Sequence, residues 1–190
     1  MKNVFKLLGT IVLLAVIGFS MVSCTGGGGK SLNSAEALEA YLDKQPANGP
    51  DKPIKVTMAA NDQMLPNIVR TISSAGKFVS LNLSGNALTA IPNSAFRECV
   101  LLAAITIPDS VTSIGKRAFY KCTSLTSVSI PKSVTSIEED VFFGCTSLTS
   151  VSIPKSVTSI CDSAFGECTS LKSVTIPNKR KMTHFTQLQG

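Results

Sequence analysis

Two landmarks recur at a fixed interval of 23 residues through the second half of this chain. One is the dipeptide Ile-Pro, and the other is a cysteine. The landmarks are Ile107-Pro108, Ile130-Pro131, Ile153-Pro154 and Ile176-Pro177, and Cys99, Cys122, Cys145 and Cys168. The segment Cys122–Ile137 is repeated letter for letter as Cys145–Ile160. Self-similarity at a period of roughly 20 to 50 residues is typical of solenoids, so the sequence predicts an α/β solenoid with one coil per repeat.

Apolar and polar residues alternate within each repeat just before the Ile-Pro pair. Val128 and Ile130 alternate with Ser127 and Ser129, which predicts a strand with one buried face. Pro131 ends that strand, because proline cannot donate to a continuing ladder of hydrogen bonds. Stacked coils should therefore form a parallel β-sheet on one face of the solenoid.

Phenylalanines and cysteines at repeated positions are expected to stack inside the coil as two ladders. The ladder residues are Phe96, Phe119, Phe142 and Phe165, and Cys99, Cys122, Cys145 and Cys168. A cysteine there behaves as a small buried hydrophobe. Adjacent rungs lie about 4.8 Å apart, but their Cβ atoms point the same way, which favours reduced thiols over disulfides. Cys161 stands where other repeats have Gly115 or Glu138 and is expected to be the one fast-reacting thiol, able to pair with another chain.

The spacing of the apolar positions also resembles a known family. The residues that carry it are Leu102, Ile105, Ile107, Pro108, Val111, Ile114, Gly115, Ala118, Phe119 and Cys122. In this spacing the stretch from Phe78 to Pro177 resembles the BspA-like leucine-rich repeats. The first repeat is longer by one residue between strand and turn, from Leu83 to Leu88. The resemblance implies a leucine-rich repeat fold outside the cytoplasm, often at the cell surface. It also implies coaggregation of cells or adhesion to host matrix proteins such as fibronectin and fibrinogen.

The first 23 residues are typical of a signal peptide that is removed from the mature chain. Lys2 and Lys6 give a positive start, and Leu7–Phe19 is apolar apart from glycine and threonine. The following Phe19–Cys24 resembles the lipobox of bacterial lipoproteins of the spirochaete type, with Met21 where leucine is usual. The resemblance implies that Cys24 becomes the lipidated first residue, a membrane anchor. The alternatives are a plain signal peptide with an incidental Cys24, or an uncleaved anchor.

The segment between the lipobox and the repeats predicts a tether and then a cap. Residues 24–33 include four consecutive glycines, which predict a flexible tether. Residues 34–77 predict a helix–strand–helix cap over the first coil. Its helices are expected over Ser34–Asp43, with Ser34 as N-cap, and over Asn61–Ala75, with Asn61 as N-cap; the strand is expected over Ile54–Met58.

The charge pattern argues against nucleic-acid binding. The net charge is +6, but part of it lies in the expected signal peptide and part in Lys179, Arg180 and Lys181 of the tail. The rest of the chain is close to neutral, and there is no Trp to stack on bases. Residues 178–190 are expected to form a basic, flexible tail.

Enzymatic and metal-binding functions are not expected either. His184 is the only histidine, it lies in the tail, and the cysteines form no CxxC pair, so the spacing of zinc ligands is missing. No nucleophile and base recur near one another, and the serines follow the period of the coil. We therefore expect no enzyme, no cofactor and no small-molecule substrate.

The strand face that points away from the core is the candidate ligand face. By alternation it carries hydroxyl and amide side chains, flanked by two lysines at the strand ends. Its residues are Ser80, Asn82, Thr106, Ser127, Ser129, Ser150, Ser152, Ser173, Thr175, Lys132 and Lys155. Such faces are the usual docking surfaces of solenoids. The alternative is that serine and threonine are simply soluble residues that suit a strand.

Together these features predict a lipoprotein of the cell envelope that presents a leucine-rich repeat surface to a protein ligand. Adhesion to host matrix or to other cells at the outer surface is the preferred role. The alternative is a structural envelope lipoprotein that faces the periplasm and has no host ligand.

Overall fold

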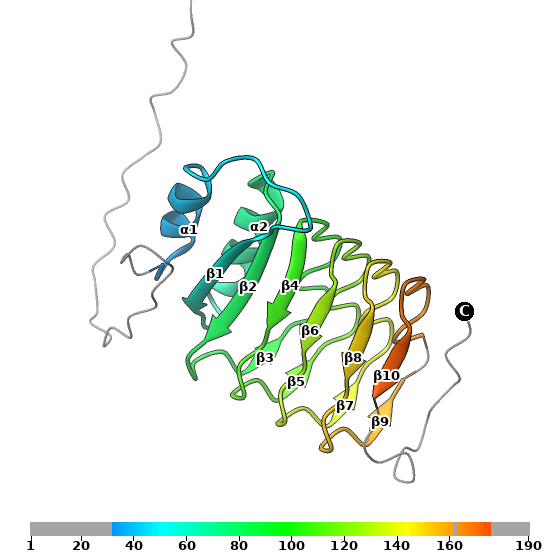
Figure 1. Ribbon diagram of the computed structural model, residues 1–190. Helices are drawn as coiled ribbons and strands as arrows, with labels where there is room; N and C mark the ends of the chain where they lie inside the picture. The colour runs from blue at the N-terminus through cyan, green and yellow to red at the C-terminus, as the bar shows by residue number, and fades with distance from the viewer. Residues whose placement is uncertain (1–31, 162, 176–190) are drawn as a thin grey trace, which may run out of the picture.

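Every coil of the solenoid adds one strand to a six-stranded parallel sheet (Figure 1). The computed structural model describes residues 32–161 and 163–175. In spatial order the strands are β1 (Ile54–Ala59), β2 (Val79–Ser84), β4 (Leu102–Thr106), β6 (Ser127–Ser129), β8 (Ser150–Ser152) and β10 (Ser173–Thr175). The predicted solenoid with a parallel sheet on one face is confirmed. The expected signal peptide 1–23, most of the tether 24–33 with Cys24, and the tail 178–190 lie outside the described residues.

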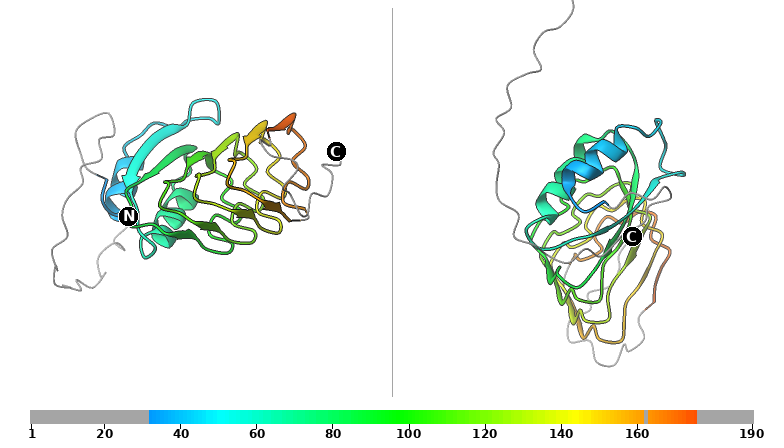
Figure 2. Two further views of the ribbon diagram at one scale, coloured as in Figure 1. Left: turned by 90° about the horizontal axis from the view of Figure 1, so that it is seen from below. Right: turned by 90° about the vertical axis from the view of Figure 1, so that its left-hand side faces the viewer.

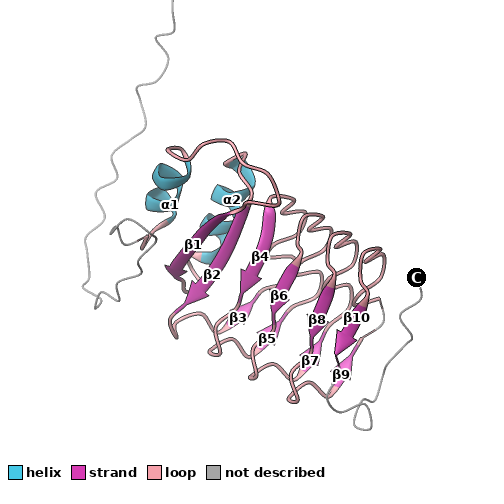
Figure 3. Ribbon diagram, viewed as in Figure 1, coloured by secondary structure: helices cyan, strands magenta, loops and turns pink. Residues whose placement is uncertain are grey.

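Short strands also pair along a second wall of the coil (Figure 3). Strand β3 (Ala90–Ile91) pairs with β5 (Ser113–Ile114), and β7 (Ser136–Ile137) pairs with β9 (Ser159–Ile160), both in parallel. The isoleucine of each strand is buried. The chain thus hydrogen-bonds to its neighbouring coil on two walls, which holds the coil closed around the core.

The N-terminal segment continues the large sheet and closes its first end. Helix α1 (Ala35–Leu42) packs against α2 (Leu65–Ser74) at the start of the stack (Figure 2). Ser34 caps α1 as predicted, since its Oγ accepts a hydrogen bond from the backbone N–H of Ala37 at 3.1 Å. Strand β1 pairs with β2 along its full length, so the segment adds a further rung to the sheet.

The second helix begins later than predicted. Asn61 was expected to be its N-cap, but α2 starts at Leu65. The Asn61 side chain instead accepts hydrogen bonds from the backbone N–H groups of Gln63 and Met64, at 3.0 and 2.8 Å, and forms a separate turn. Pro66 fits only the first turn of a helix, which explains why the helix starts just before it.

A carboxylate clasp joins the N-terminal segment to the first repeat. The backbone N–H and the hydroxyl of Thr89 donate to the Asp62 carboxylate at 3.0 and 2.9 Å. These two bonds hold the pKa of Asp62 below its ordinary value, and the bond from the backbone N–H has the larger effect. The clasp therefore stabilises the fold above the ordinary pKa of an aspartate and is lost as the pH falls through the lowered value.

The first repeat differs from the others at two places. Val79 pairs with Leu102 but Ser80 pairs with Ala104, so the sheet has an irregularity at Ala103. The extra residue noticed in the sequence, between Leu83 and Leu88, restores the register after the strand. Gly85 lies in this longer turn with φ of +90°, a conformation that suits glycine.

Stacked phenylalanines form the centre of the core. The ring centroids are 5.1 Å apart for Phe96 and Phe119, and 5.4 Å apart for Phe119 and Phe142 and for Phe142 and Phe165. The first three rings are fully buried, and the last is 7% exposed. Each buried ring contributes roughly 1.5–3 kcal/mol of transfer free energy, before the entropy of ordering is subtracted.

Two residues of each phenylalanine turn adopt left-handed backbone conformations. They are Ser94, Arg117, Asp140 and Ser163 before the ring, and Glu98, Lys121, Gly144 and Glu167 after it. The turn directs backbone N–H groups toward the next coil. The N–H of Phe119 donates to the carbonyl oxygen of Val141 at 2.9 Å, and the N–H of Lys121 donates to the carbonyl oxygen of Phe143 at 2.7 Å. These intercoil hydrogen bonds offset the strain of left-handed non-glycine residues.

Replacing Gly144 by alanine should destabilise the solenoid by about 1–2 kcal/mol. Gly144 has φ of +70°, and an added Cβ would lie 3.0 Å from Cγ of Lys121. Gly49→Ala is the matched control, since that position has an ordinary φ and no heavy atom within 4 Å. Urea unfolding of both variants measures the difference. Equal stability of Gly144→Ala and the parent would show that the turn carries no strain.

Candidate binding face

Two columns of side chains cover the outward side of the large sheet. The register places Ser80 beside Ala104 and Ala104 beside Ser127 in one column, and Asn82 beside Thr106 in the other. Ser129, Ser152 and Thr175 continue the second column, and Ser150 and Ser173 continue the first. The expected residues of the candidate face are therefore brought together on one surface.

The face is open and polar along its length. All of its expected residues are exposed except Ser80, which is half-buried. Ala104 interrupts the first column of hydroxyls, and β1 adds Lys55 and Thr57 beside Ser80 and Asn82. The alternation in Ile54–Met58 predicted a strand, but it did not place Lys55 and Thr57 on this face, because the strand lies outside the repeat. The candidate face thus spans six strands.

The flanking lysines occupy one repeated position at the strand ends. Lys132 and Lys155 follow the prolines that end β6 and β8, and both side chains are exposed. Asp109 holds the equivalent position after β4. The margin of the face is therefore positive next to the later coils and negative next to β4.

The repeated cysteines lie inside the coil. The thiols of Cys122, Cys145 and Cys168 each meet a backbone carbonyl, whereas Cys99 Sγ accepts from the Ser73 hydroxyl at 3.5 Å. The Sγ of Cys122 lies 2.9 Å from the carbonyl oxygen of Phe96, and Cys145 and Cys168 lie 3.1 Å from those of Phe119 and Phe142. Cys99, Cys122 and Cys145 are fully buried, whereas Cys168 in the last described coil is half-buried. Each of these carbonyls also accepts a backbone N–H within its turn, as Phe96 does from Cys99 at 3.0 Å. The thiol therefore adds a second, weaker hydrogen bond to a carbonyl inside the core.

Burial also makes these thiols harder to ionise. Desolvation raises the pKa of Cys99, Cys122 and Cys145 above the ordinary value, and raises that of Cys168 from 9.0 to about 11. Cys161, expected to be the exposed exception, is half-buried. Cys161 and Cys168 are thus the more accessible of the five described cysteines, where the sequence had suggested Cys161 alone.

A stack of aromatic and cationic side chains, which the sequence did not predict, lies on the wall next to the phenylalanine turns. The Arg97 guanidinium lies 5.4 Å from the ring centroid of Tyr120, and the Tyr120 and Phe143 rings stack with centroids 5.4 Å apart. The ring of Phe143 lies over Gly166, where a Cβ would approach it to 2.7 Å. The signal was the residue after each core phenylalanine, which changes from repeat to repeat and so gives no period.

Ion pairs gather on the same wall. Lys116 pairs with Glu139 at 3.1 Å, and Arg117 pairs with Asp140 at 3.1 Å and with Glu139 at 3.9 Å. Most of these side chains are about half exposed, so each pair contributes about 1 kcal/mol or less. Their effect is to compensate the charges of this wall locally.

A shallow hollow of about 800 Å³ lies at the other end of the molecule, beside the loop between α1 and β1. Tyr41, Lys52 and Ile54 are among its lining residues. Asn48 holds the loop, because its amide both donates to and accepts from the backbone of Phe78, at 2.8 and 3.0 Å. The hollow contains none of the predicted site residues.

The described residues show neither a metal centre nor a membrane span. Within residues 32–161 and 163–175, no three His, Cys, Asp or Glu side chains are grouped so that they could hold a metal ion. No helix in this part of the chain is long and apolar enough to cross a bilayer.

The parallel sheet, the stacked turns and the leucine-rich repeat positions define a leucine-rich repeat protein. Residues 71–187 match the BspA type leucine rich repeat region in six copies, which is more than half of the chain. The chain therefore belongs to this family. No curated protein matches the chain.

Solved structures of bacterial leucine-rich repeat proteins are similar to this chain. A leucine rich cell surface protein from Faecalibacterium prausnitzii is 38% identical over 51% of this chain and 25% of its own length, with a TM-score of 0.49. The Leucine Rich Repeat protein of T. pallidum is 31% identical over 68% of this chain and 60% of its own length, with a TM-score of 0.52. This chain thus spans a quarter of the first structure and three fifths of the second.

Labelling of the folded chain with a small thiol reagent at pH 8 should reach Cys161 and Cys168 first and leave Cys99, Cys122 and Cys145 unmodified. Mass spectrometry of digested protein locates the labels. Fast modification of the three buried thiols in folded protein would contradict the cysteine ladder.

The same thiols should make the stability of the fold depend on pH. Neutral buried thiols stabilise the fold below their ordinary pKa, and this contribution is lost as the pH rises toward the raised pKa values. The loss should begin near the ordinary pKa of 9.0 and, for Cys168, extend to about pH 11.

Proposed function

We propose that this protein is an envelope lipoprotein, anchored through Cys24, that binds a protein ligand on the outward face of its large sheet. The observation that carries the proposal is the open face itself: two columns of mostly exposed polar side chains run across six strands, interrupted only at Ala104. Residues 1–23 serve as the signal peptide, 24–33 as the tether, 34–77 as the cap and 78–177 as the binding solenoid, and 178–190 form a basic tail.

The chemistry of the face favours a protein ligand. Hydroxyl groups both donate and accept hydrogen bonds, so they match the backbone and polar side chains of another chain. Family membership supports this role, since the resemblance noted in the sequence associates such repeats with adhesion. Host matrix proteins such as fibronectin or fibrinogen, or proteins on other cells, are the proposed ligands.

Attachment to a membrane would compensate for weak single contacts. The face has no exposed tryptophan or arginine of the kind that dominates strong interfaces, so one copy binds weakly. Many copies held on one membrane by a flexible tether engage a repetitive ligand together, and their combined affinity exceeds that of one copy by orders of magnitude. Lipidation and the modest face thus belong to the same proposal.

Replacing Cys24 by serine should release the protein from the membrane fraction. In the lipoprotein pathway a diacylglycerol is attached through this sulfur. Loss of its two acyl chains removes the stable membrane attachment. Membrane fractionation and mass spectrometry of the N-terminal peptide measure the change. Cys161→Ser is the control and should stay in the membrane. Retention of Cys24→Ser in the membrane would overturn the lipid anchor.

Limited proteolysis of intact cells then separates the two proposed locations. An outward-facing protein is cut by added protease, whereas a periplasm-facing protein is protected until the cells are broken. Protection in intact cells would favour the structural envelope role over adhesion.

Replacing Ser127 and Ser150 together by glutamate should weaken binding to immobilised fibronectin about tenfold, because two long charged side chains then stand in the middle of the face. Both side chains are exposed, so the fold should remain intact. Thr112→Glu with Thr135→Glu is the matched control, since these residues are equally exposed but lie off the large sheet. Circular dichroism checks the fold. Unchanged binding by the face variant would place the contact on another surface.

A further inference from the structure

The large sheet has an unusual distribution of charge for a polar surface. Its six strands contain no aspartate or glutamate and a single charged residue, Lys55. The Lys55 side chain is exposed and lies beside Ser80 in the first column of the face. Any charge that a ligand meets within the sheet is therefore positive.

Further lysines border the later strands. Lys132 and Lys155 occupy equivalent positions at the ends of β6 and β8, about 4.8 Å apart along the stack, and Lys172 immediately precedes β10. All three side chains are exposed, and neither they nor Lys55 make an ion pair with another described residue. Asp109 is the one acidic residue in the repeated position of Lys132.

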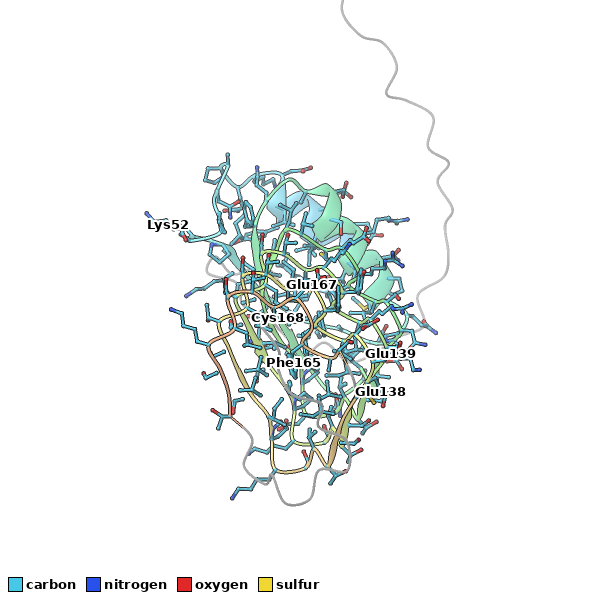
Figure 4. All side chains as sticks on the ribbon, turned by 90° about the vertical axis from the view of Figure 1, so that its right-hand side faces the viewer. Lys52, Glu138, Glu139, Phe165, Glu167 and Cys168 are labelled. Atoms are coloured by element: carbon cyan, nitrogen blue, oxygen red, sulfur yellow. The ribbon has the colours of Figure 1, made fainter. Side chains whose placement is uncertain are left out.

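The acidic residues of the same coils lie elsewhere. Figure 4, which looks along the stack, shows Glu138 and Glu139 on the side away from the strands of the large sheet. Glu139 and Asp140 are already paired with Lys116 and Arg117. The charges of that wall compensate one another. Asp109 is the acidic neighbour of Lys132 in the stack, and among the described residues Lys55, Lys132 and Lys155 make no ion pair.

We propose that the outward face of the large sheet selects an acidic segment of its protein ligand. This inference rests on the proposed function and specifies the ligand for the same face. Carboxylates accept hydrogen bonds from the serine and threonine hydroxyls and from the lysine ammonium groups. A cationic segment would be repelled by Lys55, Lys132 and Lys155, and an apolar segment would leave the hydroxyls of the face without partners. The lysines also steer an acidic chain toward the face during association.

The test uses the full chain and three fluorescent peptides of twelve residues, in which Ser alternates with Glu, Gln or Lys. Fluorescence anisotropy should show the tightest binding for the Glu peptide and a loss of that preference in high salt, because exposed charges are screened. Changing Lys55, Lys132 and Lys155 together to glutamine should weaken its binding about tenfold, at about twofold for each lysine. The control variant, with Lys44, Arg70 and Lys121 changed to glutamine, should bind as the parent does. Equal binding of the Glu and Gln peptides would overturn the inference.

Placing either positive or negative charges at Ser127 and Ser150 tests the inference separately from the proposed function. Ser127→Lys with Ser150→Lys should strengthen binding of the Glu peptide and of fibronectin, whereas the double glutamate variant weakens both. If both double variants weaken fibronectin binding equally, the face still binds the ligand but the preference for acidic segments is wrong. If neither variant changes fibronectin binding, the proposed binding role of the face fails together with the inference.

Discussion

The structure depends on hydrogen bonds between residues that lie one repeat apart. The backbone N–H of Thr126 donates to the carbonyl oxygen of Ala103 at 2.8 Å beside the large sheet. In the phenylalanine turns, the N–H of Phe142 donates to the carbonyl oxygen of Ala164 at 2.8 Å. Because each coil is bonded on several sides to its neighbours, equivalent side chains must lie over one another. A coil therefore has no stable core of its own, and the last described coil, with Val174 half-buried, is the least protected.

The periodic part of the sequence could predict this arrangement, and the aperiodic parts could not. The period alone predicted the parallel sheet and the positions that stack in the core. Strand β1 was predicted, but its pairing with β2 at the first edge of the sheet was not, since β1 lies outside the repeat. The left-handed turns were also missed, because Arg117, Asp140 and Lys121 stand where glycine would have been the signal. Their conformation is imposed by bonds to the next coil and has no local signature.

The repeated cysteines show how the same constraint can imitate a functional site. A chain with thiols at a fixed period suggests metal ligands or disulfides, yet the thiols of Cys122 and Cys145 face turn carbonyls and resist ionisation. Valine would fill the volume without reaching the carbonyl, and serine would add a more polar group to the core. A weak donor on a small apolar side chain suits both needs. Regularity in this chain thus reports packing where the side chain points inward.

Outward-pointing positions are subject to a different constraint, and this difference supports the sheet as the site of recognition. Stacking fixes where the hydroxyl columns stand but leaves their identity open, as Asn82, Thr106 and Ser129 in one column illustrate. Acidic residues would be equally soluble there, yet none occurs in the six strands, while acids are frequent on the wall that carries Glu139 and Asp140. Solubility alone does not explain such a division of charge between two exposed walls. The acidic ligand that we propose would explain it, because only the wall that meets such a ligand would need to exclude acidic side chains.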